Sequence, residues 1–172
     1  MIFNCFDWVR DSSTPKVHPT QKPVPLLERL IEIFTDKGDV VIDPCCGSGG
    51  FICSAFRHMS KDANKRKREE ILLNKIFGID INREITKISK MKLLLEENVN
   101  SNVLCANSLA DLDTIKLLLS STKENDGFDV LLTNPPFGTA GKITDSTILT
   151  SFDLGHKWRE SEDGFRITST IV

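Results

Sequence analysis

The sequence predicts an α/β fold in which helices flank a mostly parallel sheet. Short apolar stretches such as Val40–Ile42 and Ile76–Ile79 are rich in β-branched residues, as expected for strands buried on both faces. A polar or glycine-rich turn and then a helical pattern follow each of them, which is typical of βαβ units. With 172 residues, 40% of them hydrophobic, the chain is large enough to bury one core.

The composition argues against several classes of protein. The formal net charge is −2, so no global positive field attracts the chain to nucleic acid. The apolar runs are too short to span a membrane and the N-terminus lacks a signal-peptide pattern, so we expect a cytoplasmic protein without a membrane partner. Five cysteines, an odd number without paired metal-ligand spacing, favour a reducing compartment, and we expect no metal site.

The chain is predicted to divide just before its first helix. Residues 1–22 form an N-terminal arm that contains most of the run H-P-T-Q-K-P, and residues 23–172 form the main domain. The first helix is predicted to present Leu27, Leu30, Ile31 and Phe34 on its apolar face. Gly38 suits the left-handed position that ends such a helix.

The strand at 40–43 ends in the run D-P-C-C-G-S-G-G, from Asp43 to Gly50. The following helix places Phe51, Ala55 and Met59 on one face. Glycines allow the backbone to approach a ligand closely, and the start of the helix offers unpaired N–H groups. The run lacks the Gly-Lys-Ser/Thr ending of a phosphate loop and does not match G-x-G-x-x-G, which argues against a nucleotide-dependent oxidoreductase.

The next segment is a charge run at 60–70, which predicts a solvated helix end or loop and less readily a phosphate-contacting patch. The second strand, 76–80, ends in Asp80, which suits hydrogen bonds to ribose hydroxyls. Asp80 or Asn82 is also a candidate N-cap. The helix after them carries apolar residues at Ile85, Ile88, Met91 and Leu95.

Two further strands complete the predicted sheet. The third, at 102–106, leads into Asn107 and Ser108, and a helix of roughly ten residues around 115–119 returns the chain to the fourth strand at 128–133. That strand runs into Asn134-Pro135-Pro136-Phe137. Two prolines cannot continue a ladder, so the chain must leave the sheet at its carboxyl edge. There an amide oxygen and proline carbonyls can accept hydrogen bonds from a flat NH2 group while the aromatic ring stacks on it.

The pairing of N-P-P-F with D-P-C-C-G-S-G-G resembles the motifs of S-adenosylmethionine-dependent DNA adenine methyltransferases. The resemblance implies a Rossmann-like fold with strand order 3-2-1-4-5-7-6. It also implies methyl transfer from S-adenosyl-L-methionine to the exocyclic amine of a flipped adenine in DNA, within a restriction-modification system. Other planar NH2 groups fit the same acceptors, so an RNA or protein-glutamine methyltransferase stays an alternative.

The resemblance also assigns roles to residues. Asn134, Pro135, Pro136 and Phe137 would hold the target base. The H-P-T-Q-K-P run resembles a segment that packs on the methionine part of the cofactor, and Asp80 and Asn107 would meet its ribose and adenine. The implied cofactor-binding residues are Thr20, Lys22, Asp43, Pro44, Cys45, Gly47, Ser48, Gly49, Asp80, Ile81, Asn107 and Ser108.

The region after Gly138 carries less pattern. Residues 139–150 are predicted to form a polar loop, and Phe152–Trp158 resembles a segment of the modification subunits of type I restriction systems. That resemblance implies DNA and a separate recognition subunit or domain as partners. In this chain the cofactor motifs precede the catalytic motif, which resembles one subclass of the family, while the H-P-T-Q-K-P lettering resembles the subclass with the reverse order, so the subclass stays open.

The chain has four predicted strands where the family fold has seven, unless 165–172 adds a piece of the fifth. We therefore expect a partial methyltransferase domain that lacks its C-terminal strands, with the fourth strand as an apolar sheet edge. Alone, such a chain is expected to bind cofactor weakly or not at all and to leave DNA unmethylated. A catalytically silent module that binds a cofactor or a partner is the remaining alternative.

Overall fold

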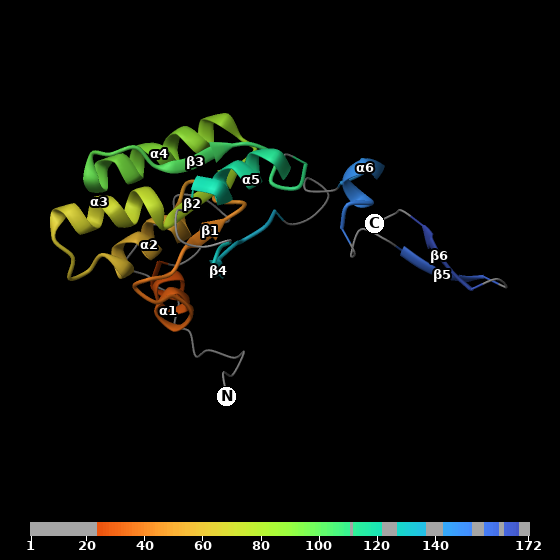
Figure 1. Cartoon of the computed structure of the whole chain (residues 1–172), viewed down its shortest axis with the longest axis horizontal. Helices are drawn as coiled ribbons and strands as arrows, with labels where there is room; N and C mark the ends of the chain where they lie inside the picture. Colours follow the sequence, from red (N-terminus) through yellow and green to blue (C-terminus); the bar gives the residue numbers. More distant parts are fainter. Residues whose placement is uncertain are drawn as a thin grey trace.

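The computed structural model describes residues 24–110, 112–121, 127–136, 143–152, 157–161 and 164–168 (Figure 1). Within these ranges no helix combines the length and the apolar character needed to cross a bilayer. The helices and strands run in the order α1 Val24–Phe34, β1 Val41–Asp43, α2 Gly50–Met59, α3 Lys65–Asn74, β2 Ile76–Asp80, α4 Arg83–Glu97, β3 Asn102–Cys105, α5 Leu112–Ser121, β4 Val130–Leu131, α6 Ser146–Leu149, β5 Lys157–Ser161 and β6 Gly164–Thr168.

The main sheet has four strands in the order β3-β2-β1-β4, and every pair in it is parallel. This confirms the predicted fold class and the first half of the predicted strand order. The strands are short, and the one before the N-P-P-F motif is the shortest, because Pro135 and Pro136 cannot join a ladder. Leu131 on this edge strand is 62% exposed, as expected of an apolar edge.

Alternation along the strands divides the core into two layers. One face of the sheet carries Val40, Ile42, Phe77 and Ile79, which pack with Leu118 of α5. The other face carries Val41, Ile76 and Val103, and it packs with α1, α2, α3 and α4. The sheet is thus covered on both faces, which is why its inner strands are apolar throughout (Figure 1).

Most helices bury the residues that their patterns predict. Leu27 and Ile31 of α1 are buried, whereas Phe34 at its end is 43% exposed. In α2, Ala55 and Met59 are buried as predicted, together with neighbours on the same side.

In α4, most of the apolar residues noted in the sequence do not face the core. The apolar positions Ile88, Met91 and Leu95 are exposed, and the buried residues are Thr86, Ser89 and Leu93. The small polar side chains allow the helix to approach the loop after β1 closely. Leu93 alone among them adds substantial apolar surface to the core.

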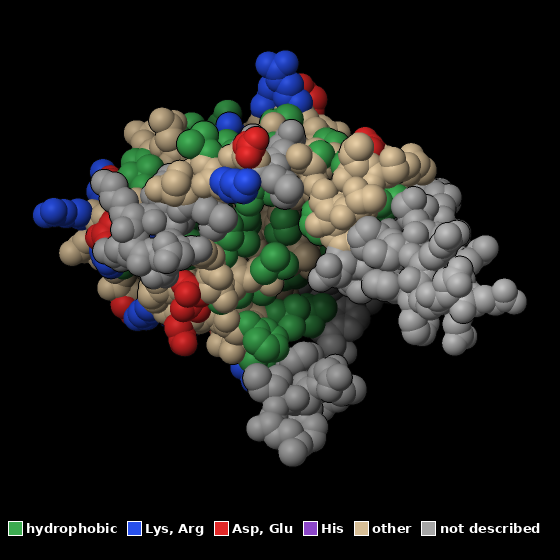
Figure 2. Space-filling view, turned by 45° about the vertical axis from the view of Figure 1, so that its right-hand side comes forward, with side chains coloured by type: hydrophobic (Ala, Val, Ile, Leu, Met, Phe, Trp, Pro, Cys, Tyr) green, Lys and Arg blue, Asp and Glu red, His purple; other side chains and the backbone are tan. Residues whose placement is uncertain are grey.

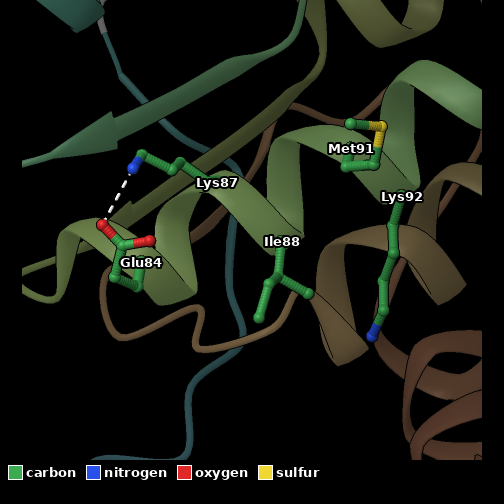
Figure 3. A pocket seen from close by; sticks show the side chains of 5 residues that line it. All are labelled: Glu84, Lys87, Ile88, Met91 and Lys92. Carbon is green, nitrogen blue, oxygen red and sulfur yellow. Dashed lines mark hydrogen bonds and ion pairs between the residues drawn. The ribbon is translucent and has the colours of Figure 1, made fainter.

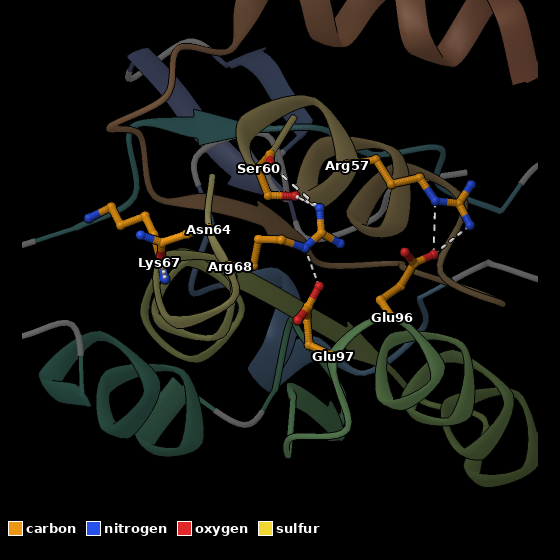
Figure 4. Close-up of polar contacts among 7 residues, drawn as sticks. All are labelled: Arg57, Ser60, Asn64, Lys67, Arg68, Glu96 and Glu97. Atoms are coloured by element: carbon orange, nitrogen blue, oxygen red, sulfur yellow. Dashed lines mark hydrogen bonds and ion pairs between the residues drawn. The ribbon is translucent and has the colours of Figure 1, made fainter. Parts of the chain in front are cut away.

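The charge run at 60–70 forms the first half of a helix that begins at the N-cap Asn64. Arg68 is not solvated as expected: its side chain is 26% exposed and pairs with Glu97 of α4 (Figure 4). Its guanidinium also lies 5.0 Å from the centre of the Phe56 ring. Arg68 Nη1 also donates to Ser60 Oγ at 2.9 Å. The run therefore includes a structural contact between α2, α3 and α4.

Two expectations for the C-terminal region need correction. Residues 146–149 form a short helix, α6, within the stretch predicted to be a polar loop, and Asp145 caps it by accepting from Thr147 N at 2.9 Å. The strand at 164–168 does not extend the main sheet. It pairs antiparallel with β5 in a separate two-stranded sheet.

Candidate functional site

The candidate site lies where the four parallel strands end. Asp43 closes β1 and Asp80 closes β2, while Asn107 and Asn134 follow shortly after β3 and β4. Since the strands are parallel, their carboxyl ends meet at one edge of the sheet, which is where open α/β sheets bind ligands. Figure 2, which brings the right-hand side of Figure 1 forward, shows hydrophobic side chains exposed across the middle of that face.

The loop after β1 is shaped by two glycines in left-handed conformations. Gly47 has φ 52° and Gly49 has φ 84°. A Cβ on Gly49 would lie 2.6 Å from the Ser89 hydroxyl oxygen, so this position excludes a side chain on steric as well as conformational grounds. Cys46 N donates to the Ile79 carbonyl at 2.9 Å and ties the loop to β2. The result is a fixed backbone turn that leads into α2.

Asp80 holds this loop from the neighbouring strand. Its Oδ2 accepts from Gly47 N at 2.9 Å, and its Oδ1 accepts from Asn82 N at 2.8 Å. Asn82 is the N-cap of α4, since its side chain accepts from Glu84 N and Ile85 N. A carboxylate has about four acceptor positions, so two remain for a ligand's hydroxyl groups.

Asp43 is a buried acid. The residue is 2% exposed, and burial raises the pKa of its carboxyl to about 6. The N–H of Cys45, which donates to Asp43 Oδ1 at 3.0 Å, lowers this pKa, and the negative charge of Asp80 raises it. A ligand cation beside this carboxyl would relieve the cost of ionising it. The sulfonium and ammonium groups of S-adenosylmethionine are cations of this kind, so these residues fit that cofactor.

Thr133 is a member of the site that sequence reasoning missed. Its hydroxyl lowers the pKa of both Asp43 and Cys45, so it lies close to both side chains. The hydroxyl is buried, and its distances and angles to the described residues do not meet the criteria for a hydrogen bond. Ser108 approaches Cys45 from the loop after β3, and burial is the main cause of the raised pKa of that thiol. The only signal for Thr133 was its place directly before Asn134.

The loop that follows Thr133 is held at the sheet edge. Leu132 N donates to the Ile42 carbonyl at 3.0 Å, which anchors the chain two residues before Asn134. Asn134 is half-buried, whereas Pro135 and Pro136 are exposed. The geometry therefore brings the start of the N-P-P-F motif beside the loop after β1.

The remaining predicted residues fall into three groups. Asn107 Oδ1 accepts from Leu109 N at 3.0 Å and so forms a turn, and its contact with cofactor adenine stays a prediction. Pro44 and Ser48 belong to the loop after β1, while Ile81 is 71% exposed just beyond Asp80. Three predicted residues lie outside the described part of the chain, namely Thr20, Lys22 and Phe137.

Metal ligands are not grouped in the part of the chain that the structure describes, where no three His, Cys, Asp or Glu side chains are placed to hold an ion. The cysteines of the loop are also poor thiolate ligands. Burial raises the pKa of Cys46 to about 12 and that of Cys53 in α2 to about 11. The described residues at this edge offer hydrogen-bonding groups, the buried carboxyl of Asp43 and the carboxylate of Asp80.

Comparison with known proteins adds independent information. The chain is 33% identical over 116 residues to the type II restriction enzyme and methyltransferase RM.BcgI of Heyndrickxia coagulans, covering 67% of this chain and 17% of that protein. It is 35% identical over 103 residues to the type II methyltransferase M.HpaI of Haemophilus parainfluenzae, covering 56% of this chain and 28% of that protein. The chain thus spans less than a third of the length of these relatives.

A solved structure supports the same relationship. A modification subunit of a proposed type I restriction enzyme from Vibrio vulnificus superposes with a TM-score of 0.58 and 32% identity, covering 76% of this chain and 25% of that one. The model of the N-6 DNA Methylase family matches residues 20–162, which is most of the sequence. The chain therefore belongs to the N-6 DNA methylase family.

Proposed function

We propose that this chain supplies the cofactor-binding and base-holding part of a DNA adenine-N6 methyltransferase of a restriction-modification system. The main observation behind this proposal is that Thr133, which precedes Asn134 in sequence, lies beside Asp43 at the end of β1 and Cys45 in the loop after it. A motif suited to holding a planar amine is thus beside a loop suited to a cationic cofactor. Family membership and the names of the relatives support the same activity.

The proposed cofactor is S-adenosyl-L-methionine, which supplies a methyl group activated by a sulfonium when it is bound. Asp43 would face its positive end, and the backbone of the Cys45–Gly49 loop would line it. Asp80 would accept from the ribose hydroxyls with its remaining acceptor positions. Asn107 and Ser108 would meet the adenine ring, and Thr20, Lys22 and Ile81 would complete its surroundings.

The proposed work of the N-P-P-F motif is positioning. The lone pair of an aromatic amine is delocalised into the ring, so the amine is a poor nucleophile. The Asn134 side-chain oxygen and the Pro135 carbonyl would accept its two N–H groups and hold the nitrogen in a geometry suited to attack. Phe137 would stack on the flipped base, and the amine proton would leave after transfer, so the first step needs no general base.

DNA and a recognition subunit or domain are the proposed partners. The relatives that this chain matches are much longer, so target recognition would come from segments or subunits outside these 172 residues. The solved relative named above is itself a modification subunit, which supports an assembly with further chains.

Cofactor binding is the first experiment. The purified chain, shown to be folded by circular dichroism, is titrated calorimetrically with S-adenosylmethionine, alongside Asp80→Ala and the matched control Asp62→Ala, a fully exposed acid. We expect weak, saturable binding that Asp80→Ala abolishes and Asp62→Ala leaves unchanged. A folded chain that bound NADH and not S-adenosylmethionine would contradict the proposal.

Substrate class needs a second assay. Methyl transfer from labelled S-adenosylmethionine is followed to DNA, RNA and a glutamine-containing peptide in a lysate from cells that express the chain with its neighbouring genes. We expect label in DNA as N6-methyladenine, lost with Asn134→Ala and retained with Asn100→Ala. Label in RNA or peptide alone would favour the alternative amino-methyltransferases.

A further inference from the structure

The outer face of α4 carries a row of exposed apolar side chains. Ile88, Met91 and Leu95 are 47%, 56% and 79% exposed. They are spaced three and four residues apart, so they lie along one stripe of the helix. The core does not require this row, because α4 packs inward through other residues. Contiguous exposed apolar side chains of this kind mark interaction sites.

The row is hollowed near the middle of the helix. A shallow depression there is lined by two apolar residues and three charged ones: Glu84, Lys87, Ile88, Met91 and Lys92. Figure 3 shows Ile88 and Met91 along the helix between Lys87 and Lys92. Lys87 Nζ pairs with Glu84 at 2.8 Å, and Lys92 reaches the Ser48 hydroxyl at 3.4 Å. The lysines therefore flank an apolar strip.

Cations outnumber acids around the depression, which Lys87 and Lys92 line together with one acid, Glu84. Four exposed cations lie on α4 as a whole, and Glu84 is the one exposed acid in its first three turns. Lys87 and Lys92 border the apolar row, whereas Arg83 and Lys90 lie on other sides of the helix. Two glutamates follow at the end of the helix, but both already serve neighbouring helices. Glu96 pairs with Arg57 at 2.5 Å, and Glu97 pairs with Arg68 (Figure 4).

We propose that the outer face of α4 binds an amphipathic helix of a partner protein whose apolar stripe is flanked by acidic side chains. From Ile88 to Leu95 the row extends over roughly 10 Å, enough for about two turns of a partner helix. Apolar residues of the partner would cover Ile88 and Met91, and its carboxylates would lie beside the flanking lysines. This is the helix-in-groove mode of recognition with charge complementarity that selects the partner.

The same charges argue against other occupants. In a symmetric contact between two copies, the lysines of each α4 would face those of the other, which is repulsive. A membrane-binding helix presents a broad apolar face with cations above it, whereas here the apolar row is narrow and lies between Lys87 and Lys92. Nucleic acid would use the cations but leave the apolar row uncovered.

The proposal is tested on the full chain with a designed probe. A fluorescein-labelled helical peptide carries leucines at alternating spacings of three and four and glutamates beside them, and a matched peptide has lysine for every glutamate. Fluorescence anisotropy measures binding to the wild type, to Met91→Glu and to Leu117→Glu. Leu117 of α5 is 71% exposed on another face and so provides the matched control.

We expect saturable binding of the acidic peptide and at least tenfold weaker binding of the basic one. Met91→Glu should weaken the acidic peptide at least tenfold, while Leu117→Glu should leave it unchanged. Raising salt to about 0.5 M should reduce the preference between the peptides, because screening shortens the range of the charges. Circular dichroism should show both variants folded, since both sites are exposed.

Several outcomes would overturn this assignment. Equal affinity for the two peptides would show that charge complementarity does not select the partner. An equal loss of affinity in Leu117→Glu would show that the peptide does not bind at α4. Self-association in sedimentation that Met91→Glu abolishes would identify a second copy as the occupant. Binding to phosphatidylglycerol vesicles that Met91→Glu abolishes would identify an anionic lipid surface. Each result is independent of cofactor binding, so it separates this inference from the proposed methyltransferase activity.

Discussion

Helices α2 and α4 start at the same edge of the sheet and pack on the same face, yet they use their apolar residues in opposite ways. In α2, Ile52, Ala55 and Phe56 are fully buried. In α4, Thr86 and Ser89 face inward, while Met91 and Leu95 face out. The core accounts for the apolar pattern of α2, but it does not account for that of α4.

The difference teaches that an apolar helical pattern identifies a contact face without identifying the partner. The loop after β1 and α4 lie very close together at Gly49 and Ser89, since a Cβ on Gly49 would be 2.6 Å from the Ser89 hydroxyl oxygen. This close approach accounts for the small polar residues on the inner side of α4. Its apolar residues are then left exposed on the outer side of the helix.

The largest expected effect is a direct test of this contrast. Phe56→Ala should lower the free energy of unfolding by about 3–5 kcal/mol, because it opens a cavity in a fully buried site. Met91→Ala should change it by less than about 0.5 kcal/mol, because Met91 is 56% exposed. Urea unfolding of both variants measures the difference. A comparable loss in Met91→Ala would mean that α4 packs through its outer face.

The contact between α2 and α4 is tested next by Gly49→Ala. We expect the free energy of unfolding to fall by roughly 2–3 kcal/mol, because the backbone is left-handed at Gly49 and because the Ser89 hydroxyl lies 2.6 Å from the new Cβ. Gly38→Ala is the control, since Gly38, contrary to the expectation from the sequence, is not left-handed, and nothing lies within 4 Å of a Cβ there. Ser89→Ala added to Gly49→Ala should recover part of the loss in thermal unfolding. Full additivity of the two changes would show that Ser89 does not constrain the loop.

The buried acid before α2 predicts a pH dependence. The folded-state pKa of Asp43, about 6, lies above its ordinary value of 3.8, so its contribution to stability is fully present below pH 3.8 and is lost as pH rises through 6. Asn does not ionise, so between pH 4 and pH 7 the free energy of unfolding of Asp43→Asn should rise by about 2 kcal/mol relative to that of the wild type. Urea unfolding across this range measures the gain. A constant difference between the two proteins would mean that Asp43 ionises normally.

The smallest expected effect concerns the ion pair that joins α3 to α4. Arg68→Met leaves the carboxylate of Glu97, 7% exposed, without its partner, and should cost about 2 kcal/mol. Lys87→Met breaks an exposed pair on the outer face of α4 and should cost no more than about 0.5 kcal/mol. Thermal unfolding of the two variants provides the comparison. Equal costs would remove the distinction between the inner and outer faces of α4.

The sequence by itself determined the sheet and the loops at its carboxyl edge. Short continuous apolar runs followed by turn residues are typical of strands covered on both faces, and all four predicted strands occur in a parallel sheet. Asp43, Asp80 and Asn134 are placed at strand ends because an acid or a proline pair stops each run. Local chemistry was sufficient there, because strand and turn signals act over a few residues.

Only the tertiary structure decided which contacts those residues make. Thr133 carries no motif, and its place beside Asp43 and Cys45 depends on β4 lying next to β1. The sequence predicts that Arg68 is part of a solvated charge run, but in the structure it pairs with Glu97 and lies over the Phe56 ring. The exposure of the apolar residues of α4 could not be predicted from the sequence either. Periodicity indicates that apolar residues share one side of a helix, but whether that side is buried depends on residues distant in sequence.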